Sequence, residues 1–380
     1  MKHLIIISLL VLSTFTTQAQ EPETVYSFAL VSKPLSWQKE QVKAWKAEID
    51  KNPQNAIAWL NYYLATRNVL KTDPADKRTY EEKQEDLYKL VDNMGKAIPN
   101  SYEYNLCMWK NNGFDFKYYP YLEKAIALGA GRTEHLDYII NIAEMNRDVA
   151  KRNEASIKKW EAGLLSPGMM YYNYNVLAGL EPNAILVTAG DNDTYPAWCV
   201  QAQGFRTDVT VINTSLIMVQ EYRERLFKEL GVTFTPPKSE DMDEFKKELV
   251  KALVNNNKGY PLYIGLTAIG HDGISKTIQD KLYLTGLAYL YCENPIDEKA
   301  VLKKNFEQIY TLDYISRSFY TDISAPLVKV INQNYIVPML KLYDHYKAAG
   351  DINKQTWIKE LVLAVSKGTG CEADVNKHLN

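Results

Sequence analysis

The stretch ILVTAGDNDTYPAWCVQAQGFRTDVTVINTSLI, residues 185–217, decides how the fold is read from the sequence. Five apolar or β-branched residues, 185–189, predict a strand that runs directly into the turn Gly-Asp-Asn-Asp-Thr. Pro196 is expected near the first position of the following helix, and Gly204 just after its end. A second apolar run, 209–213, predicts the next strand. Together these elements indicate a βαβ unit.

The alternation of strands and helices extends over residues 166–295. It predicts a parallel sheet with right-handed crossovers. Before this segment, from about residue 36, and again beyond Pro295, the spacing of apolar residues is helical. The predicted strands are 185–189, 209–213, 262–269 and 282–291, and the predicted helices between them are 196–203, 219–230 and 240–254.

The helical parts have the character of degenerate helical-hairpin repeats. The run N-P-x-x-A-x-x-W at 52–59 and the run A-I-P-N at 97–100 resemble tetratricopeptide junctions, although their separation exceeds the usual ~34 residues. Residues 335–349 and 353–365 predict another such hairpin. Repeats of this kind mainly dock partners. The predicted fold class is therefore α/β plus all-α, a Rossmann-like small parallel sheet flanked by tetratricopeptide-like helical hairpins.

The N-terminal residues have the composition of a secretory signal peptide. A basic start is followed by an apolar run over 4–12 and a small polar end at Thr17-Gln18-Ala19. Cleavage near Ala19 would deliver a periplasmic or secreted protein. No later segment has ~18 uninterrupted apolar residues, so we expect no stable membrane insertion. The expected domains are 1–19 (signal peptide), 20–165 (helical repeat-like), 166–295 (Rossmann-like α/β) and 296–380 (C-terminal helical hairpin).

Several classes of function lose support from the composition. The formal net charge of −2 argues against a nucleic-acid-binding surface. The chain has no G-x-G-x-x-G, G-x-x-x-x-G-K-[ST], H-E-x-x-H or G-x-S-x-G pattern, so we expect no cofactor. Its few histidines argue against a multi-histidine metal site. The four cysteines form no C-x-x-C pair, and we expect mostly buried free thiols at Cys107, Cys199, Cys292 and Cys371.

Polar residues follow three of the predicted strands at their carboxyl ends. In an open parallel sheet, this edge is where ligands are usually held. If the three strands are parallel neighbours, their turns converge there. The candidate ligand-binding residues are Asp191, Asn192, Asp193, Thr194, Asn213, Ser215, His271 and Asp272.

The chemistry of these residues has two interpretations. Asp191 and Asp193 form a D-x-D arrangement that can share a divalent cation and so bind a sugar diphosphate, and any metal would bind there. Alternatively, Asp193 or Thr194 caps the helix while Asp191 stabilises its positive end. We favour this structural role because Asp and Thr are common at such positions. His271 could act as a general base or metal ligand, but a loop histidine between glycines is more often a surface residue.

Several runs share the pattern of one family. They are N-A-I-L at 183–186, G-D-N-D-T-Y-P-x-W at 190–198, R-T-D-V at 206–209, V-I-N-x-S-L at 211–216, P-L-Y-I at 261–264 and G-L-A-Y at 286–289. They resemble the soluble C-terminal region of large bacterial multi-spanning membrane proteins related to eukaryotic transmembrane protein O-mannosyltransferases. The resemblance covers roughly residues 180–365. The family's glycosyltransferase chemistry is attributed to its membrane-embedded N-terminal half, which is replaced here, so no catalytic residue carries over.

The resemblance implies a stand-alone extracytoplasmic relative of an accessory region, working beside an envelope glycosylation or glycan system. We therefore expect a non-catalytic binding or scaffold protein whose helical repeats hold a protein partner. One alternative is a soluble enzyme that acts on glycans or sugar phosphates through Asp191, Asp193 and His271. Another is purely structural helical-repeat assembly. Among the aromatic residues of the helical part, Tyr63 and Tyr104 are the expected surface anchors.

Overall fold

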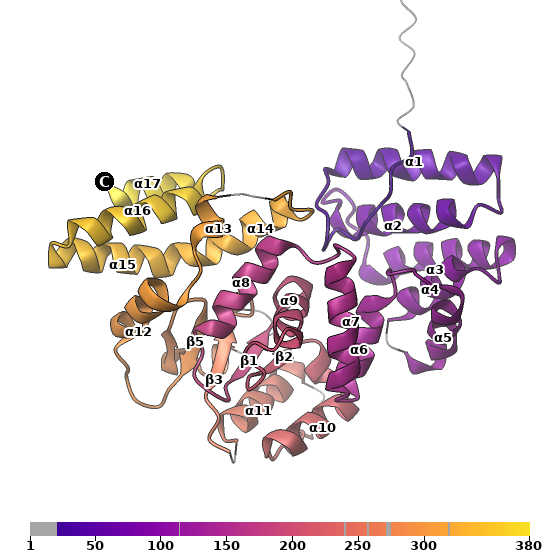
Figure 1. Ribbon diagram of the computed structural model, residues 1–380. Helices are drawn as coiled ribbons and strands as arrows, with labels where there is room; N and C mark the ends of the chain where they lie inside the picture. The colour runs from indigo at the N-terminus through magenta and orange to yellow at the C-terminus, as the bar shows by residue number, and fades with distance from the viewer. Residues whose placement is uncertain (1–20, 114, 239–240, 257, 271–274, 318–319) are drawn as a thin grey trace, which may run out of the picture. The chain divides into compact units, whose positions relative to one another are not determined.

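The computed structural model describes residues 21–113, 115–238, 241–256, 258–270, 275–317 and 320–380 (Figure 1). The chain forms two compact units. Unit 1 contains residues up to Tyr26 and Lys33–Leu128, and unit 2 contains Ser27–Ser32 and Gly129–Asn380. Each unit is described separately below.

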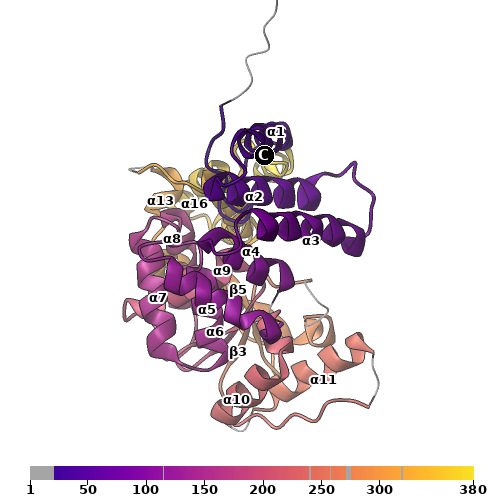
Figure 2. The same ribbon diagram turned by 90° about the vertical axis from the view of Figure 1, so that its right-hand side faces the viewer.

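Unit 1 is helical. Successive helices pack against one another, and α1, α2 and α3 lie side by side (Figure 2). Polar side chains start these helices: Asn55 accepts a hydrogen bond from the amide of Ala58, and Thr79 and Glu82 form a reciprocal capping box. The helices are α1 (Leu35–Lys51), α2 (Ala56–Thr72), α3 (Tyr80–Ala97), α4 (Tyr102–Asn112) and α5 (Tyr119–Leu128).

The core of unit 1 corrects one expectation. Tyr63 was expected at the surface, yet its side chain is fully buried and its hydroxyl lies 3.4 Å from Oδ1 of Asn111 on α4. Tyr104 is half-buried and packs edge-on against Tyr121. The reason is that α2 contacts α1, α3 and α4, so more than one of its faces is covered. Neither residue is therefore a free anchor for a partner.

Unit 2 combines a small sheet with many helices. Its helices are α6 (Leu136–Met145), α7 (Val149–Glu161), α8 (Pro167–Ala178), α9 (Asp191–Ala202), α10 (Gln220–Leu230), α11 (Met242–Val254), α12 (Glu298–Lys304), α13 (Asp313–Ser316), α14 (Ala325–Asn332), α15 (Ile336–Ala349), α16 (Ile352–Ser366) and α17 (Glu372–Leu379). Its strands are β1 (Ile185–Thr188), β2 (Thr210–Asn213), β3 (Leu262–Gly265), β4 (Leu282–Leu284) and β5 (Ala288–Tyr291).

The sheet has the strand order β2-β1-β3-β5-β4. β1 pairs in parallel with both β2 and β3, so three of the strands are parallel neighbours as expected. β5 is antiparallel to β3, and β4 is antiparallel to β5. The prediction of a purely parallel sheet is therefore wrong, and the sheet is mixed.

A glycine turn explains the antiparallel edge. Residues 282–291 were expected to form one strand, but the chain reverses at Gly286, whose φ is +139°. A Cβ atom there would lie 2.1 Å from the hydroxyl oxygen of Tyr310. Only glycine combines this backbone angle with such a close approach. The reversal produces a hairpin in place of a single strand.

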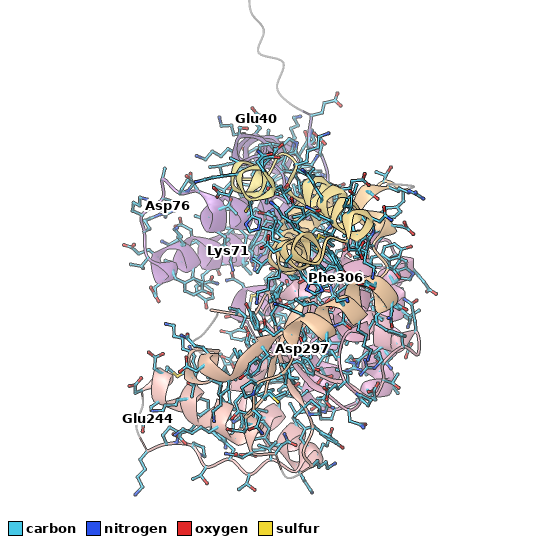
Figure 3. The ribbon with its side chains drawn as sticks, turned by 90° about the vertical axis from the view of Figure 1, so that its left-hand side faces the viewer. Glu40, Lys71, Asp76, Glu244, Asp297 and Phe306 are labelled. Atoms are coloured by element: carbon cyan, nitrogen blue, oxygen red, sulfur yellow. The ribbon has the colours of Figure 1, made fainter. Side chains whose placement is uncertain are left out.

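The C-terminal part of unit 2 contains the expected hairpin of α15 and α16. Gly350 ends α15 with a φ of +68°, and the side chain of Asp351 caps α16 by accepting from the amide of Lys354. Phe306 lies buried between α12 and these helices, with its ring 6.2 Å from that of Tyr335 (Figure 3). In the part of the chain that the structure describes, no helix is both long and apolar enough to cross a membrane.

We predict that Gly286→Ala lowers the free energy of unfolding of unit 2 by roughly 2–4 kcal/mol, because it adds backbone strain and a steric clash. Urea denaturation followed by circular dichroism measures this change. Gly350→Ala is the matched control, since its φ is also positive but nothing lies within 4 Å of the added Cβ. The control should cost only ~1–2 kcal/mol. Equal losses for the two variants would contradict the role assigned to the Tyr310 contact.

Candidate functional site

The turns after β1, β2 and β3 meet at one edge of the sheet, because these strands are parallel neighbours. Thr188 at the end of β1 is in register with Asn213 at the end of β2. The helix after β1 begins at Asp191. The sequence predicted that this helix begins near Tyr195, with Pro196 close to its first position. The helix begins earlier, and Pro196 is the sixth residue of α9.

An asparagine from another helix makes Pro196 acceptable inside α9. Proline has no N–H, so the carbonyl of Asn192 loses its usual helical donor. Nδ2 of Asn173, a buried residue on α8, donates to that carbonyl at 2.9 Å. The helix therefore continues through the proline with the freed acceptor satisfied.

Asp193 holds the turn between β1 and α9 together. Its Oδ2 accepts from the amide of Ala189 at 2.8 Å, and its Oδ1 accepts from the amide of Gly190 at 2.7 Å. The hydroxyl of Thr267, just after β3, also donates to Oδ2. Asp193 thus caps the helix by reaching back from its third residue.

The Asp193 side chain is only 4% exposed. Burial raises its pKa, while the hydrogen bonds from Thr267, Ala189 and Gly190 act in the opposite direction. A carboxylate enclosed by three donors has little capacity left for a ligand. The arrangement favours the structural interpretation of this residue.

Thr194 and Asn213 form a second closed network beside Asp193. The hydroxyl oxygens of Thr188 and Thr194 are 2.8 Å apart, and Nδ2 of Asn213 donates to Oγ1 of Thr194 at 3.0 Å. Oδ1 of Asn213 accepts from the amide of Ser215 at 2.9 Å. The first three side chains are buried, whereas Ser215 is exposed. These polar groups converge as expected, but they bind one another.

Asp191 and Asn192 have different surroundings. Asp191 is exposed at the first position of α9, where a negative charge interacts favourably with the helix dipole. Nδ2 of Asn192 donates to the carbonyl of Ala29 at 3.1 Å, within unit 2. The two carboxylates of the D-x-D run are therefore in unlike environments, one exposed and one enclosed.

Two of the candidate residues, His271 and Asp272, lie outside the described residues. Over the described part of the chain, no group of three or more His, Cys, Asp or Glu residues is arranged to hold a metal ion. All four cysteines are free; Cys107 and Cys199 are buried, and Cys292 and Cys371 are half-buried. The buried state raises the pKa of Cys199 to about 11.

Sequence reasoning missed Thr267 and Asn173 as partners of the turn. Thr267 lies two residues beyond the end of β3, but the predicted strand, 262–269, extended past it and so hid its place in a turn. Asn173 is one of two asparagines on α8, and nothing in the local pattern distinguishes it from Asn175. Its partner is Asn192, which is 19 residues away in the chain.

Sequence reasoning also missed a buried ionic cluster around Glu144 on α6. This carboxylate is fully buried; its Oε2 accepts from Arg152 at 2.6 Å, and its Oε1 accepts from the hydroxyl of Tyr222 at 2.9 Å and from Arg147. Burial raises the pKa of the Tyr222 phenol well above its ordinary value. The paired charges join α6, α7 and α10, which indicates a structural role.

Arg206 and Asp208 form a further structural pair in the loop before β2. The guanidinium of Arg206 donates to the carbonyls of Leu177 and Leu180 at the end of α8 and makes a two-point contact with Asp208. Asp208 also accepts from the amide of Asn183 at 2.8 Å. The hydrogen bond from Arg206 is the main cause that lowers the pKa of Asp208 to about 2.

A family model described as TMEM260-associated domain 2 matches residues 169–258. The matched segment contains most of α8, all of β1, α9, β2, α10 and α11, and the Asp193 turn. No curated protein and no solved structure matches the chain at a significant level. The similarity therefore concerns the α/β part of unit 2.

We predict that Asp193→Ala lowers the free energy of unfolding by roughly 2–4 kcal/mol, because a helix cap is lost and two backbone donors are left without their partner. Thermal and urea denaturation measure the change. Asp191→Ala is the matched control, two residues away and exposed, and should cost less than ~1 kcal/mol. Equal stability of both variants and the unchanged protein would contradict the capping role.

The Arg206–Asp208 pair predicts a pH dependence. The folded-state pKa of Asp208, about 2, lies below its ordinary value of 3.8, so its contribution is complete above about pH 4 and is lost as the pH falls towards 2. The shift corresponds to at most ~2.4 kcal/mol. The Asp208 side chain is 32% exposed, so screening reduces this to about 1 kcal/mol. The difference in free energy of unfolding between the unchanged protein and Asp208→Asn should therefore shrink by about 1 kcal/mol as the pH falls from 5 to 2. A difference that stays constant with pH would contradict a stabilising contact between Arg206 and Asp208.

Proposed function

We propose that the chain is a non-catalytic binding or scaffold protein of the cell envelope, accessory to a glycosylation or glycan-handling system. The observation that carries the proposal is the closed state of the Asp193 turn. Two of the polar residues that a ligand at this sheet edge would need are engaged with the fold itself: Asp193 binds two amides and a hydroxyl, and Thr194 binds Thr188 and Asn213. These hydrogen bonds stabilise the turn and leave the side chains little capacity to bind a ligand.

The link to glycans rests on similarity. The G-D-N-D-T-Y-P-x-W run lies within the segment that matches TMEM260-associated domain 2. It also resembles the soluble C-terminal region of bacterial membrane proteins related to O-mannosyltransferases. An accessory role beside such a system needs no catalytic residue in this chain. We further propose export to the periplasm or exterior, with cleavage near Ala19, which lies outside the described residues.

The architecture supports a docking role. We infer that β1, α9, β2 and the helices around them form a Rossmann-like module within residues 166–295. We also infer that residues 20–165 and 296–380 are tetratricopeptide-like hairpin regions, because consecutive helices such as α1 and α2, or α15 and α16, pack directly on one another. Helical hairpins present extended surfaces on which a partner can bind.

Two tyrosines on α3 are exposed and are available to a protein partner. Tyr80 is 67% exposed and Tyr88 is 44% exposed, and they lie two helical turns apart on the same helix. Exposed aromatic side chains are typical anchors of interfaces. They replace Tyr63 and Tyr104 in the proposal, since those side chains pack inside unit 1.

We predict that the full chain captures a protein partner from its native envelope, and that the double variant Tyr80→Ala/Tyr88→Ala captures at least about tenfold less. Cross-linking followed by mass spectrometry measures the yield. The control is Asp191→Asn, which changes the exposed carboxylate of the turn and should leave capture unchanged.

The same chains also test the alternatives, with a sugar diphosphate binding measurement added to the capture experiment. An enzyme acting on glycans or sugar phosphates through Asp191, Asp193 and His271 would bind a sugar diphosphate with Mn²⁺ and lose that binding in Asp191→Asn. Assembly of identical chains would yield only the chain itself. Either result would overturn the proposed function, whereas a captured envelope protein that depends on the α3 tyrosines would support it.

A further inference from the structure

Residues 21–26 of unit 1, Glu-Pro-Glu-Thr-Val-Tyr, form neither helix nor strand and are held against α1 and α2; we call them the strap (Figure 1). Side chains of the two helices bind its main chain. The bonds are Glu23 N to Gln41 Oε1 (2.8 Å), Gln41 Nε2 to Glu21 O (3.4 Å), Trp45 Nε1 to Glu23 O (2.9 Å), Val25 N to Asn61 Oδ1 (2.7 Å) and Asn68 Nδ2 to Tyr26 O (2.8 Å).

The amide side chains that bind the strap are buried. Gln41 and Asn68 are fully buried, and Asn61 is 5% exposed. A buried amide is costly unless its donors and acceptors are satisfied. Here the strap supplies main-chain partners for all three. The inner face of α1 is accordingly polar, with Gln38 and Gln41 buried where a helical hairpin usually has aliphatic residues.

The strap itself contributes few side-chain contacts. Among its described residues only Val25, at 2% exposure, is buried. Glu23 adds a polar contact, because its carboxylate accepts from Nε1 of Trp37 at 3.1 Å. The remaining side chains are exposed. Recognition therefore depends on the main chain, one aliphatic side chain and one acidic side chain two residues before it.

This combination is the general chemistry of peptide recognition, in which main-chain bonds provide affinity and a few side-chain positions provide specificity. Most of the bonds would form equally with any extended backbone. A different segment with an acidic residue two positions before a valine-sized residue would make the same contacts. The surface of α1 and α2 that holds the strap, here called the strap site, is thus suited to more than one occupant.

We propose that the strap site binds an extended acidic-x-aliphatic segment of a partner protein, and that the strap occupies the site in cis as a competitor. The proposal rests on the proposed binding function but concerns a surface other than the α3 tyrosines. A segment tethered to its own site has a millimolar effective concentration. The strap therefore keeps weak ligands out of the strap site. The apparent affinity for a partner segment is reduced by the fraction of chains whose strap is released.

The test uses the full chain and a fluorescently labelled synthetic peptide with the strap sequence Glu-Pro-Glu-Thr-Val-Tyr. Val25→Asp places a charge at the buried position and should release the strap without altering the site. Fluorescence anisotropy should then show peptide binding at least roughly tenfold tighter than to the unchanged chain. Val25→Ala, a milder change, should give an intermediate gain. A peptide with Asp in place of valine should bind neither variant.

The matched control is Val25→Ala combined with Gln41→Leu, which removes the amide that binds Glu21 and Glu23 and should abolish the gain. Circular dichroism establishes whether each variant is folded. If Val25→Asp does not fold, the peptide affinity of Val25→Ala is the test. Folded Val25→Ala that gains no affinity for the peptide overturns the proposal, as does equal binding of the valine and aspartate peptides. Because the measurement uses purified protein, its result is independent of whether an envelope partner is captured through α3.

Discussion

The α/β part of this molecule depends on the carboxylate of Asp193. The chain turns from the end of β1 into α9, and the backbone amides of Ala189 and Gly190 at that turn need acceptors. Asp193 satisfies both amides and receives the hydroxyl of Thr267 from beyond β3. One side chain therefore fixes the start of α9 relative to two parallel strands. The same closure is why we assign the turn a structural role.

Buried amide side chains solve a related problem throughout the chain. Irregular segments cannot satisfy their own backbone groups, and a buried unpaired group is costly. Asn173 supplies the donor that Pro196 removes from α9. Asn175 both donates to and accepts from the backbone of Thr311. Gln41, Asn61 and Asn68 bind the main chain of the strap. In the strap site, the same buried amides can bind the backbone of another chain.

The sequence allowed the central βαβ unit, the convergence of its turns and the C-terminal hairpin to be predicted, because each follows from local apolar spacing and end signals. What it did not reveal depends on contacts between distant residues. Pro196 suggested a helix start, because a proline inside a helix removes a hydrogen-bond donor. The donor that replaces it, Asn173, lies on another helix and could not be recognised from the sequence. The close approach that requires glycine at position 286 comes from Tyr310, which is distant in the sequence. The burial of Tyr63 depends on how several helices pack around α2.

Hydrogen exchange of single amides, followed by nuclear magnetic resonance, tests the central claim most directly. If Asp193 closes the turn, the amide protons of Ala189 and Gly190 exchange as slowly as those of the paired strand residues in β1, and Asp193→Ala makes them fast while Leu186 stays protected. If Ala189 and Gly190 exchange at unprotected rates in the unchanged protein, the carboxylate does not hold the turn. The structural role assigned to Asp193 would then be wrong.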